Sequence, residues 1–100
     1  HGATVDAARN DGASPLFLAA QEGHDDVAKT LLAHGAAVDA ANSDGATPLY
    51  AAAQEGHIDM AETLLAHGAA VDAAYHDGGT PLFFASQEGH IDMAKTLLAH

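Results

Sequence analysis

Hydrophobic residues along this chain fall into short helical patterns separated by glycine and polar residues. In the middle of the chain, Thr47 precedes a largely apolar stretch that begins at Pro48 and runs to Glu55 and Gly56. A hydroxyl residue followed by proline is typical of a helix start, so we predict a short helix over Pro48–Glu55. Apolar residues after Gly56 recur at the spacing of one helix face, which predicts a second helix. They are Met60, Ala61, Leu64 and Leu65.

The same pattern returns every 33 residues. Blocks 34–66 and 67–99 are identical at 26 of 33 positions, and blocks 1–33 and 34–66 at 24. We therefore divide the chain into three units, residues 1–33, 34–66 and 67–100, and expect them to form a single domain over residues 1–100. Neither helix of a unit is long enough to be stable in isolation, so each must be held by its neighbours.

The segment between one helix pair and the next predicts a projecting loop. After the second helix of the middle unit, Gly68 stands where a left-handed C-terminal cap is expected. From there, Ala69–Ala74 leads into Asp77 and Gly78. An Asp-Gly pair is typical of a tight turn between extended segments. The predicted fold is therefore all-α, a solenoid of helix-turn-helix units with projecting β-hairpin loops.

The middle unit and the residues that directly follow it carry a specific set of motifs, which are Asp44-Gly45-Ala46-Thr47-Pro48-Leu49, Gly56-His57, Leu64-Leu65 and Gly68-Ala69. These motifs and the 33-residue period resemble the ankyrin repeat, and the resemblance covers all 100 residues. It implies a right-curving stack of L-shaped units whose hairpin tips and first helices line a concave face. It also implies a soluble, intracellular protein that binds other proteins.

Two core positions depart from the pattern of that family. The histidine that usually follows Thr-Pro-Leu is replaced by an aromatic residue, and a bulky β-branched position in the second helix is alanine. The residues concerned are Phe17, Tyr50 and Phe83, and Ala28, Ala61 and Ala94. We interpret the two changes together: the aromatic rings are expected to fill space that the alanines leave.

Composition narrows the class of partner. Fourteen Asp and Glu against three Lys and Arg give a formal net charge of −11. Clustered cations are needed to bind a nucleic-acid backbone or an anionic membrane surface, so we expect neither partner. Apolar runs are far shorter than a membrane helix requires. The chain has no cysteine, which excludes disulfides, thiolate metal sites and cysteine nucleophiles.

The eight histidines do not predict a metal site. Seven of them fall at two repeat positions, which are His24, His57 and His90, and His1, His34, His67 and His100. Equivalent positions on stacked helices are about 8–10 Å apart, too far for ligands of one ion with bonds of about 2 Å. We expect these imidazoles to cap helix ends and brace the turns between units. No nucleophile elbow, phosphate loop or dinucleotide motif is present, so we predict neither a cofactor nor catalysis.

Differences between the units indicate where a partner protein would bind. Variation gathers in the positions that flank the Asp-Gly turn and in one position expected to face out of the first helix. The candidate partner-binding residues are Arg9, Asn10, Leu18, Asn42, Ser43, Tyr75, His76 and Phe84. Tyr75, His76 and Phe84 carry most weight, because aromatic side chains are typical interface anchors. The repeated Gln-Glu pairs at 21–22, 54–55 and 87–88 add acidic charge, which favours a basic or polar partner.

Two other interpretations of the repeats stay open. The terminal units lack the polar outer face with which repeat arrays usually end, so the chain is also expected to self-associate, or to stack on further repeats, through these uncapped ends. The near-identity of the units is equally compatible with an engineered, consensus-like scaffold that has no natural partner.

Overall fold

Each of the three units folds into a pair of helices in the computed structural model, which describes residues 5–100. The first pair is α1 (Pro15–Glu22) and α2 (Asp25–Ala33), the second α3 (Pro48–Glu55) and α4 (Ile58–Ala66), and the third α5 (Pro81–Gln87) and α6 (Ile91–Leu98). The helix predicted over Pro48–Glu55 is therefore confirmed at both ends. No helix in residues 5–100 combines the length and apolar character needed to cross a bilayer.

The first helix of the second unit begins and ends where the sequence signals indicated. The hydroxyl of Thr47 accepts a hydrogen bond from the N–H of Tyr50 at 3.2 Å, and Pro48 occupies the first helical position. Gly56 ends α3 with a φ of 74°, a left-handed conformation that glycine adopts without the steric cost of a Cβ. Ser14 and Thr80 cap α1 and α5 in the same way.

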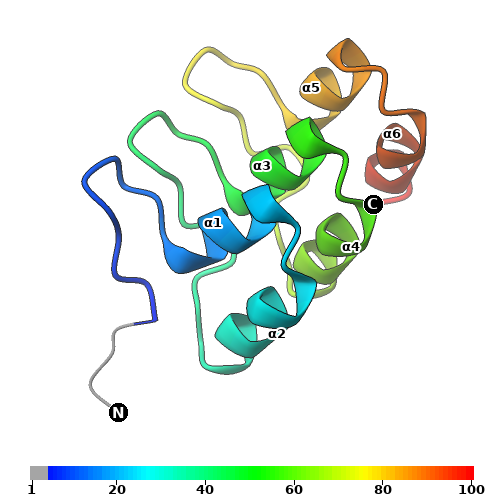
Figure 1. The fold of residues 1–100 in the computed structure, drawn as a ribbon. Helices are drawn as coiled ribbons and strands as arrows, with labels where there is room; N and C mark the ends of the chain where they lie inside the picture. Colours follow the sequence, from blue (N-terminus) through cyan, green and yellow to red (C-terminus); the bar gives the residue numbers. More distant parts are fainter. Residues whose placement is uncertain (1–4) are drawn as a thin grey trace.

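The helices form two layers, and the loops project to one side of them (Figure 1). The first helices α1, α3 and α5 stack on one another in one layer, and the second helices α2, α4 and α6 form the other. Between the layers lies a continuous apolar core, and its side chains that are at most 1% exposed include Leu16, Leu49, Met60, Leu64 and Met93. The predicted all-α stack of helix-turn-helix units is confirmed.

Each unit begins with a projecting loop, and the tips of the first, second and third loops are Asp11-Gly12, Asp44-Gly45 and Asp77-Gly78. The loops are hairpin-shaped, but no β-strand forms in residues 5–100. The N–H of Asn42 donates to the carbonyl of Ala46 at 2.9 Å. The returning N–H of Ala46 donates instead to the Asn42 side-chain Oδ1, at 3.0 Å. An antiparallel ladder requires the two residues to exchange both backbone bonds. Because a side-chain oxygen takes the second bond, the segments that flank the turn stay irregular and do not form strands.

The outward faces of the first and last units expose apolar side chains that are buried elsewhere. Leu98 is 70% exposed, whereas its counterparts Leu32 and Leu65 are each 9% exposed because the next unit covers them. On the opposite face, Val27 is 50% exposed and its counterpart Met60 only 1%. Each unit therefore has two different apolar faces, one directed toward the preceding unit and one toward the following unit.

Candidate partner-binding surface

The tip of each loop is a tight turn built around the Asp-Gly pair. In the second unit, the N–H of Gly45 donates to the carbonyl of Asn42 at 3.0 Å, and Gly45 has a φ of 87°. A Cβ at this position would lie 3.1 Å from the backbone nitrogen of His76 in the next loop. Glycine is therefore required both for the left-handed turn and for the close approach of the neighbouring loop.

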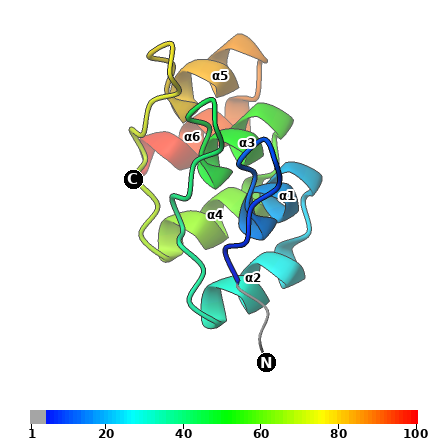
Figure 2. The same cartoon turned by 90° about the vertical axis from the view of Figure 1, so that its left-hand side faces the viewer.

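Hydrogen bonds tie each loop to the one before it. Ser43 donates to the carbonyl of Asp11 through its N–H at 3.0 Å and its Oγ at 2.7 Å. His76 contacts the carbonyl of Asp44 through its N–H at 3.3 Å and its Nδ1 at 2.7 Å. Figure 2 looks onto the loops, which lie beside one another in the order of the units. This bracing orders the surface before any partner arrives, which lowers the entropic cost of binding.

Five ring-bearing side chains gather where the second and third units meet, and we call Tyr50, Tyr75, His76, Phe83 and Phe84 the aromatic cluster. Tyr50 of α3 stacks on Tyr75 of the third loop, with ring centroids 5.0 Å apart and planes 14° apart. Phe84 of α5 packs edge-on against Tyr50 at 4.7 Å. Tyr50, Tyr75 and Phe84 are only partly buried, and Phe83 is 56% exposed. The cluster therefore offers a partner a rigid apolar surface.

Gly79 makes room for this cluster. A Cβ at Gly79 would lie 2.6 Å from Cε2 and 2.8 Å from Cζ of Phe84, which is too close for the ring to stay in place. The second unit has the opposite arrangement, with Ala46 and Ala51 at the two equivalent positions, both nearly fully buried. The change from alanine to glycine and the change from alanine to phenylalanine are thus sterically coupled.

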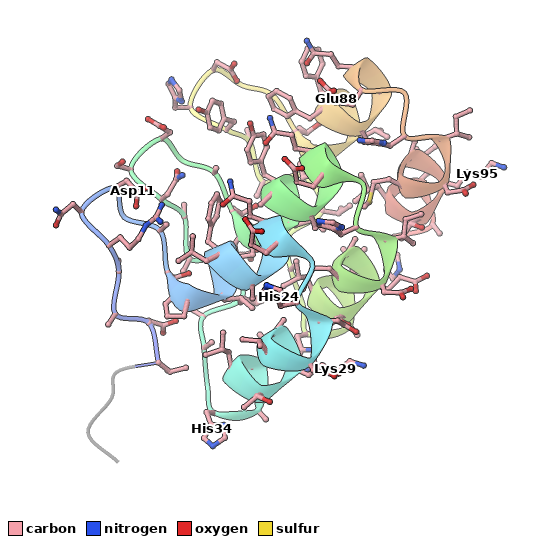
Figure 3. All side chains as sticks on the ribbon, viewed as in Figure 1. Asp11, His24, Lys29, His34, Glu88 and Lys95 are labelled. Carbon is pink, nitrogen blue, oxygen red and sulfur yellow. The ribbon has the colours of Figure 1, made fainter. Side chains whose placement is uncertain are left out.

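Negative charge surrounds the aromatic cluster. Partial burial raises the pKa of the Tyr50 hydroxyl above its ordinary value, and the neighbouring Tyr75 and the carboxylates of Asp77 and Asp44 raise it further. The cations lie elsewhere. Lys29 and Lys95 are on the second helices, away from the loops (Figure 3).

Arg9, which lies on the first loop, is already paired. Its Nη2 donates to Asp11 Oδ2 at 2.7 Å and its Nε to Asp11 Oδ1 at 3.3 Å. The hydrogen bonds and charge of this pair hold the pKa of Arg9 above, and that of Asp11 below, its usual value.

The structure brings together some of the predicted partner-binding residues and separates others. Tyr75, His76 and Phe84 lie in the aromatic cluster, whereas Arg9 and Asn10 are exposed at the first loop. Leu18 is partly buried against the core. The remaining two predicted residues serve the loops themselves: Asn42 accepts two backbone N–H groups within its own turn, and Ser43 braces the preceding loop.

Two expectations about the first helices need correction. The position shared by Leu18, Ala51 and Phe84 was expected to face outward, but Ala51 is only 2% exposed. The fourth-position aromatics were expected to fill space beside the alanines of the second helix. Phe17 is indeed buried, but Tyr50 packs on Tyr75 and Phe84, and Phe83 on Phe84. Tyr50 and Phe83 are therefore surface residues that the repeat pattern did not predict, although both stand next to the variable position.

Most of the repeated histidines have the bracing roles that the sequence indicated. Nε2 of His57 lies 3.2 Å from the carbonyl of Gln21, and Nε2 of His90 lies 3.1 Å from that of Gln54. His34 and His67 hydrogen-bond through Nδ1 to threonine carbonyls in the last turns of α2 and α4. His1 lies outside the described residues. Within residues 5–100, no three His, Asp or Glu side chains are placed to share a metal ion.

Comparison with protein families identifies the repeat. A family model described as ankyrin repeats (three copies) matches residues 1–75 and residues 40–100, and these two matches together span the chain. No curated protein matches the chain significantly.

Proposed function

The chain belongs to the ankyrin-repeat family, and from this premise we propose that residues 1–100 act as one domain, a scaffold without chemistry of its own. Ankyrin repeats are generally protein-interaction modules. The proposed binding surface is formed by the loop tips and the first helices, and its partner is another protein.

One observation carries this proposal, namely that the aromatic cluster remains partly exposed on a braced surface. Tyrosine and phenylalanine supply much contact area with few rotatable bonds, which is why such side chains often dominate interface energies. The hydrogen bonds from His76 to the carbonyl of Asp44 hold the loop that carries Tyr75 against the loop before it. The partner is therefore expected to contact Tyr50 and Tyr75, which belong to different units.

The experiment compares three forms of the chain. The test variant Tyr75→Asn/Phe84→Ala introduces the residues that the second unit already carries at these positions, so it is expected to fold. The control Val27→Met introduces, on α2, the methionine found in the other two units. Proteins retained from a cell extract by the wild type and by the control are purified, and their dissociation constants are measured with all three forms.

The proposal expects a partner whose affinity for the test variant is at least about tenfold lower, as hot-spot truncations typically cause. Matching far-ultraviolet circular dichroism must show that the variant has folded. Equal affinity of every purified partner for the wild type and the folded test variant would place binding elsewhere and overturn the proposal.

A second candidate function is stacking through the apolar end faces, and the 70% exposure of Leu98 favours it. A second copy that covered this face would reproduce the contact that the third unit makes with the second. Light scattering across a hundredfold range of concentration tests this candidate. A mass that rises with concentration supports stacking, whereas a constant 10.1 kDa excludes it for this chain.

A further inference from the structure

We propose that the aromatic cluster, together with the carboxylates of Asp44 and Asp77, binds an arginine side chain of an extended basic segment in the partner protein. This inference rests on the proposed function and specifies the chemistry of the partner. It commits to arginine, and not to lysine or to an uncharged apolar side chain.

Aromatic rings and carboxylates meet at one place on the surface. A methyl group at Gly79 would contact both Cε2 of Phe84, at 2.6 Å, and Oδ1 of Asp77, at 3.2 Å. The ring edge and the carboxylate therefore flank the same point. The charges of Asp77 and Asp44 also act on the hydroxyl of Tyr50. A guanidinium group fits such a site, because it stacks on aromatic rings and donates hydrogen bonds to carboxylates.

The first loop shows how this turn holds a guanidinium. Asp11 Oδ1 accepts the N–H of Ala13 at 3.0 Å, which fixes the carboxylate, and Asp11 then accepts two bonds from Arg9. Asp77, at the equivalent position of the third loop, accepts the N–H of Gly79 at 3.0 Å in the same manner. In the third unit, however, the position of Arg9 is taken by Tyr75. The third loop thus keeps the acceptor and replaces the internal cation with an aromatic ring.

No cation within the described residues competes for this place. Neither Asp44 nor Asp77 forms an ion pair in residues 5–100, where the pairs found are Arg9 with Asp11 and Lys29 with Asp25. The net charge of −11 attracts any basic segment over a long range. Long-range attraction does not distinguish arginine from lysine, so a preference for arginine reports on direct contact with the rings or the carboxylates, and the variants separate these two contributions.

The test measures binding of four acetylated pentapeptides, Gly-X-Gly-X-Gly amide, in which X is arginine, lysine, citrulline or glutamate. The chain has two tyrosines and no tryptophan, and both tyrosines lie in the aromatic cluster. Intrinsic tyrosine fluorescence therefore reports directly on this site. The matched variant is Tyr75→Asn/Phe84→Ala, which leaves the net charge unchanged and keeps Tyr50 as a reporter. Asp77→Asn tests the carboxylate separately.

The arginine peptide is expected to bind the wild type about three- to tenfold tighter than the lysine peptide, and the citrulline and glutamate peptides more weakly still. Tyr75→Asn/Phe84→Ala should abolish the preference for arginine, and Asp77→Asn should weaken binding of both cationic peptides. Equal affinity for arginine and lysine, or a preference that survives in the folded double variant, would overturn the inference.

These results are distinguishable from failure of the proposed function. If a purified partner requires the aromatic cluster but tolerates replacement of its arginines by lysine, the scaffold function stands and the arginine inference is wrong. If every partner binds the double variant normally, the proposed function itself fails.

Discussion

Replacing Gly79 with alanine is expected to have opposite effects on stability depending on the residue at position 84. The backbone of Gly79 does not have a positive φ, so alanine introduces no backbone strain there. Its Cβ would instead meet the ring of Phe84 at 2.6 Å. In a Phe84→Ala background that ring is absent, and the pair of alanines reproduces Ala46 and Ala51 of the second unit, which pack at 1% and 2% exposure.

The magnitude follows from two terms. Gly→Ala at an unstrained position stabilises by about 0.4–1 kcal/mol, because alanine restricts the unfolded chain. Overpacking against a held side chain costs about 1–3 kcal/mol. With Phe84 present, the overpacking term outweighs the gain and Gly79→Ala destabilises. Without Phe84, only the gain remains. The unfolded-chain term is the same in both backgrounds, so the coupling free energy is the overpacking term, about 1–3 kcal/mol.

Urea unfolding followed by far-ultraviolet circular dichroism measures the four free energies of this double-mutant cycle. The tyrosine signal in the near ultraviolet shows separately whether Gly79→Ala moves the ring away from Tyr50 and Tyr75. Equal destabilisation by Gly79→Ala in both backgrounds would refute the steric argument and point to the backbone of the turn. A stabilising effect in the presence of Phe84 would refute it too, because the ring would then have yielded without cost.

Three further predictions concern a titration, a turn and a helix cap. The pKa of Tyr50 is raised chiefly by burial. Its neutral form therefore stabilises the fold below the ordinary tyrosine pKa of about 10, and this contribution is lost as pH rises through the folded-state pKa. Asp77→Asn should lower the folded-state pKa, as measured by tyrosinate absorbance. His90→Ala should cost about 0.5–1.5 kcal/mol in urea unfolding, since it removes a bond to the preceding unit. The control His24→Ala removes the equivalent imidazole of the first unit, for which residues 5–100 contain no preceding glutamine carbonyl, and should change little. Thr47→Ala should lower the free energy of unfolding by about 1 kcal/mol, and Thr47→Ser should restore most of it.

The sequence predicts the helices of this fold well because their ends depend on local chemistry. Thr47 followed by Pro48 starts α3 and Gly56 ends it, and each of these effects involves neighbours along the chain. The loops are predicted less well. Whether the N–H of Ala46 pairs with a backbone carbonyl or with the side chain of Asn42 depends on a competition between two acceptors of similar strength. In the first and third loops the aspartate of the Asp-Gly pair itself accepts the corresponding N–H, so the pair signals the turn without fixing which side chain takes the bond.

The candidate surface is predictable only in part for a related reason. Tyr75, His76 and Phe84 differ from their counterparts in the other units, so variation identifies them. Tyr50 occupies a position that is aromatic in every unit and therefore resembles a core residue. Phe17 at the equivalent position is buried, with only 7% of its surface exposed. Exposure at this position therefore depends on the neighbouring unit. The repeat pattern describes the residues of a single unit. Tyr50 becomes part of the surface cluster only through its contact with Tyr75, which the next unit supplies.

That junction links recognition to the stability of the third unit. In a repeat protein each unit contacts only its neighbours, so the free energy that holds the third unit resides in its interface with the second. Tyr50 contributes to this interface from α3, while Tyr75 and Phe84 contribute from the other side. A partner that binds all three adds its binding free energy to the same interface, about 2.7 kcal/mol at a hundredfold excess over Kd. The partner should therefore protect the amides of α5 and α6 from exchange more than those of α1 and α2, since its contacts span only the junction that holds the last unit in place.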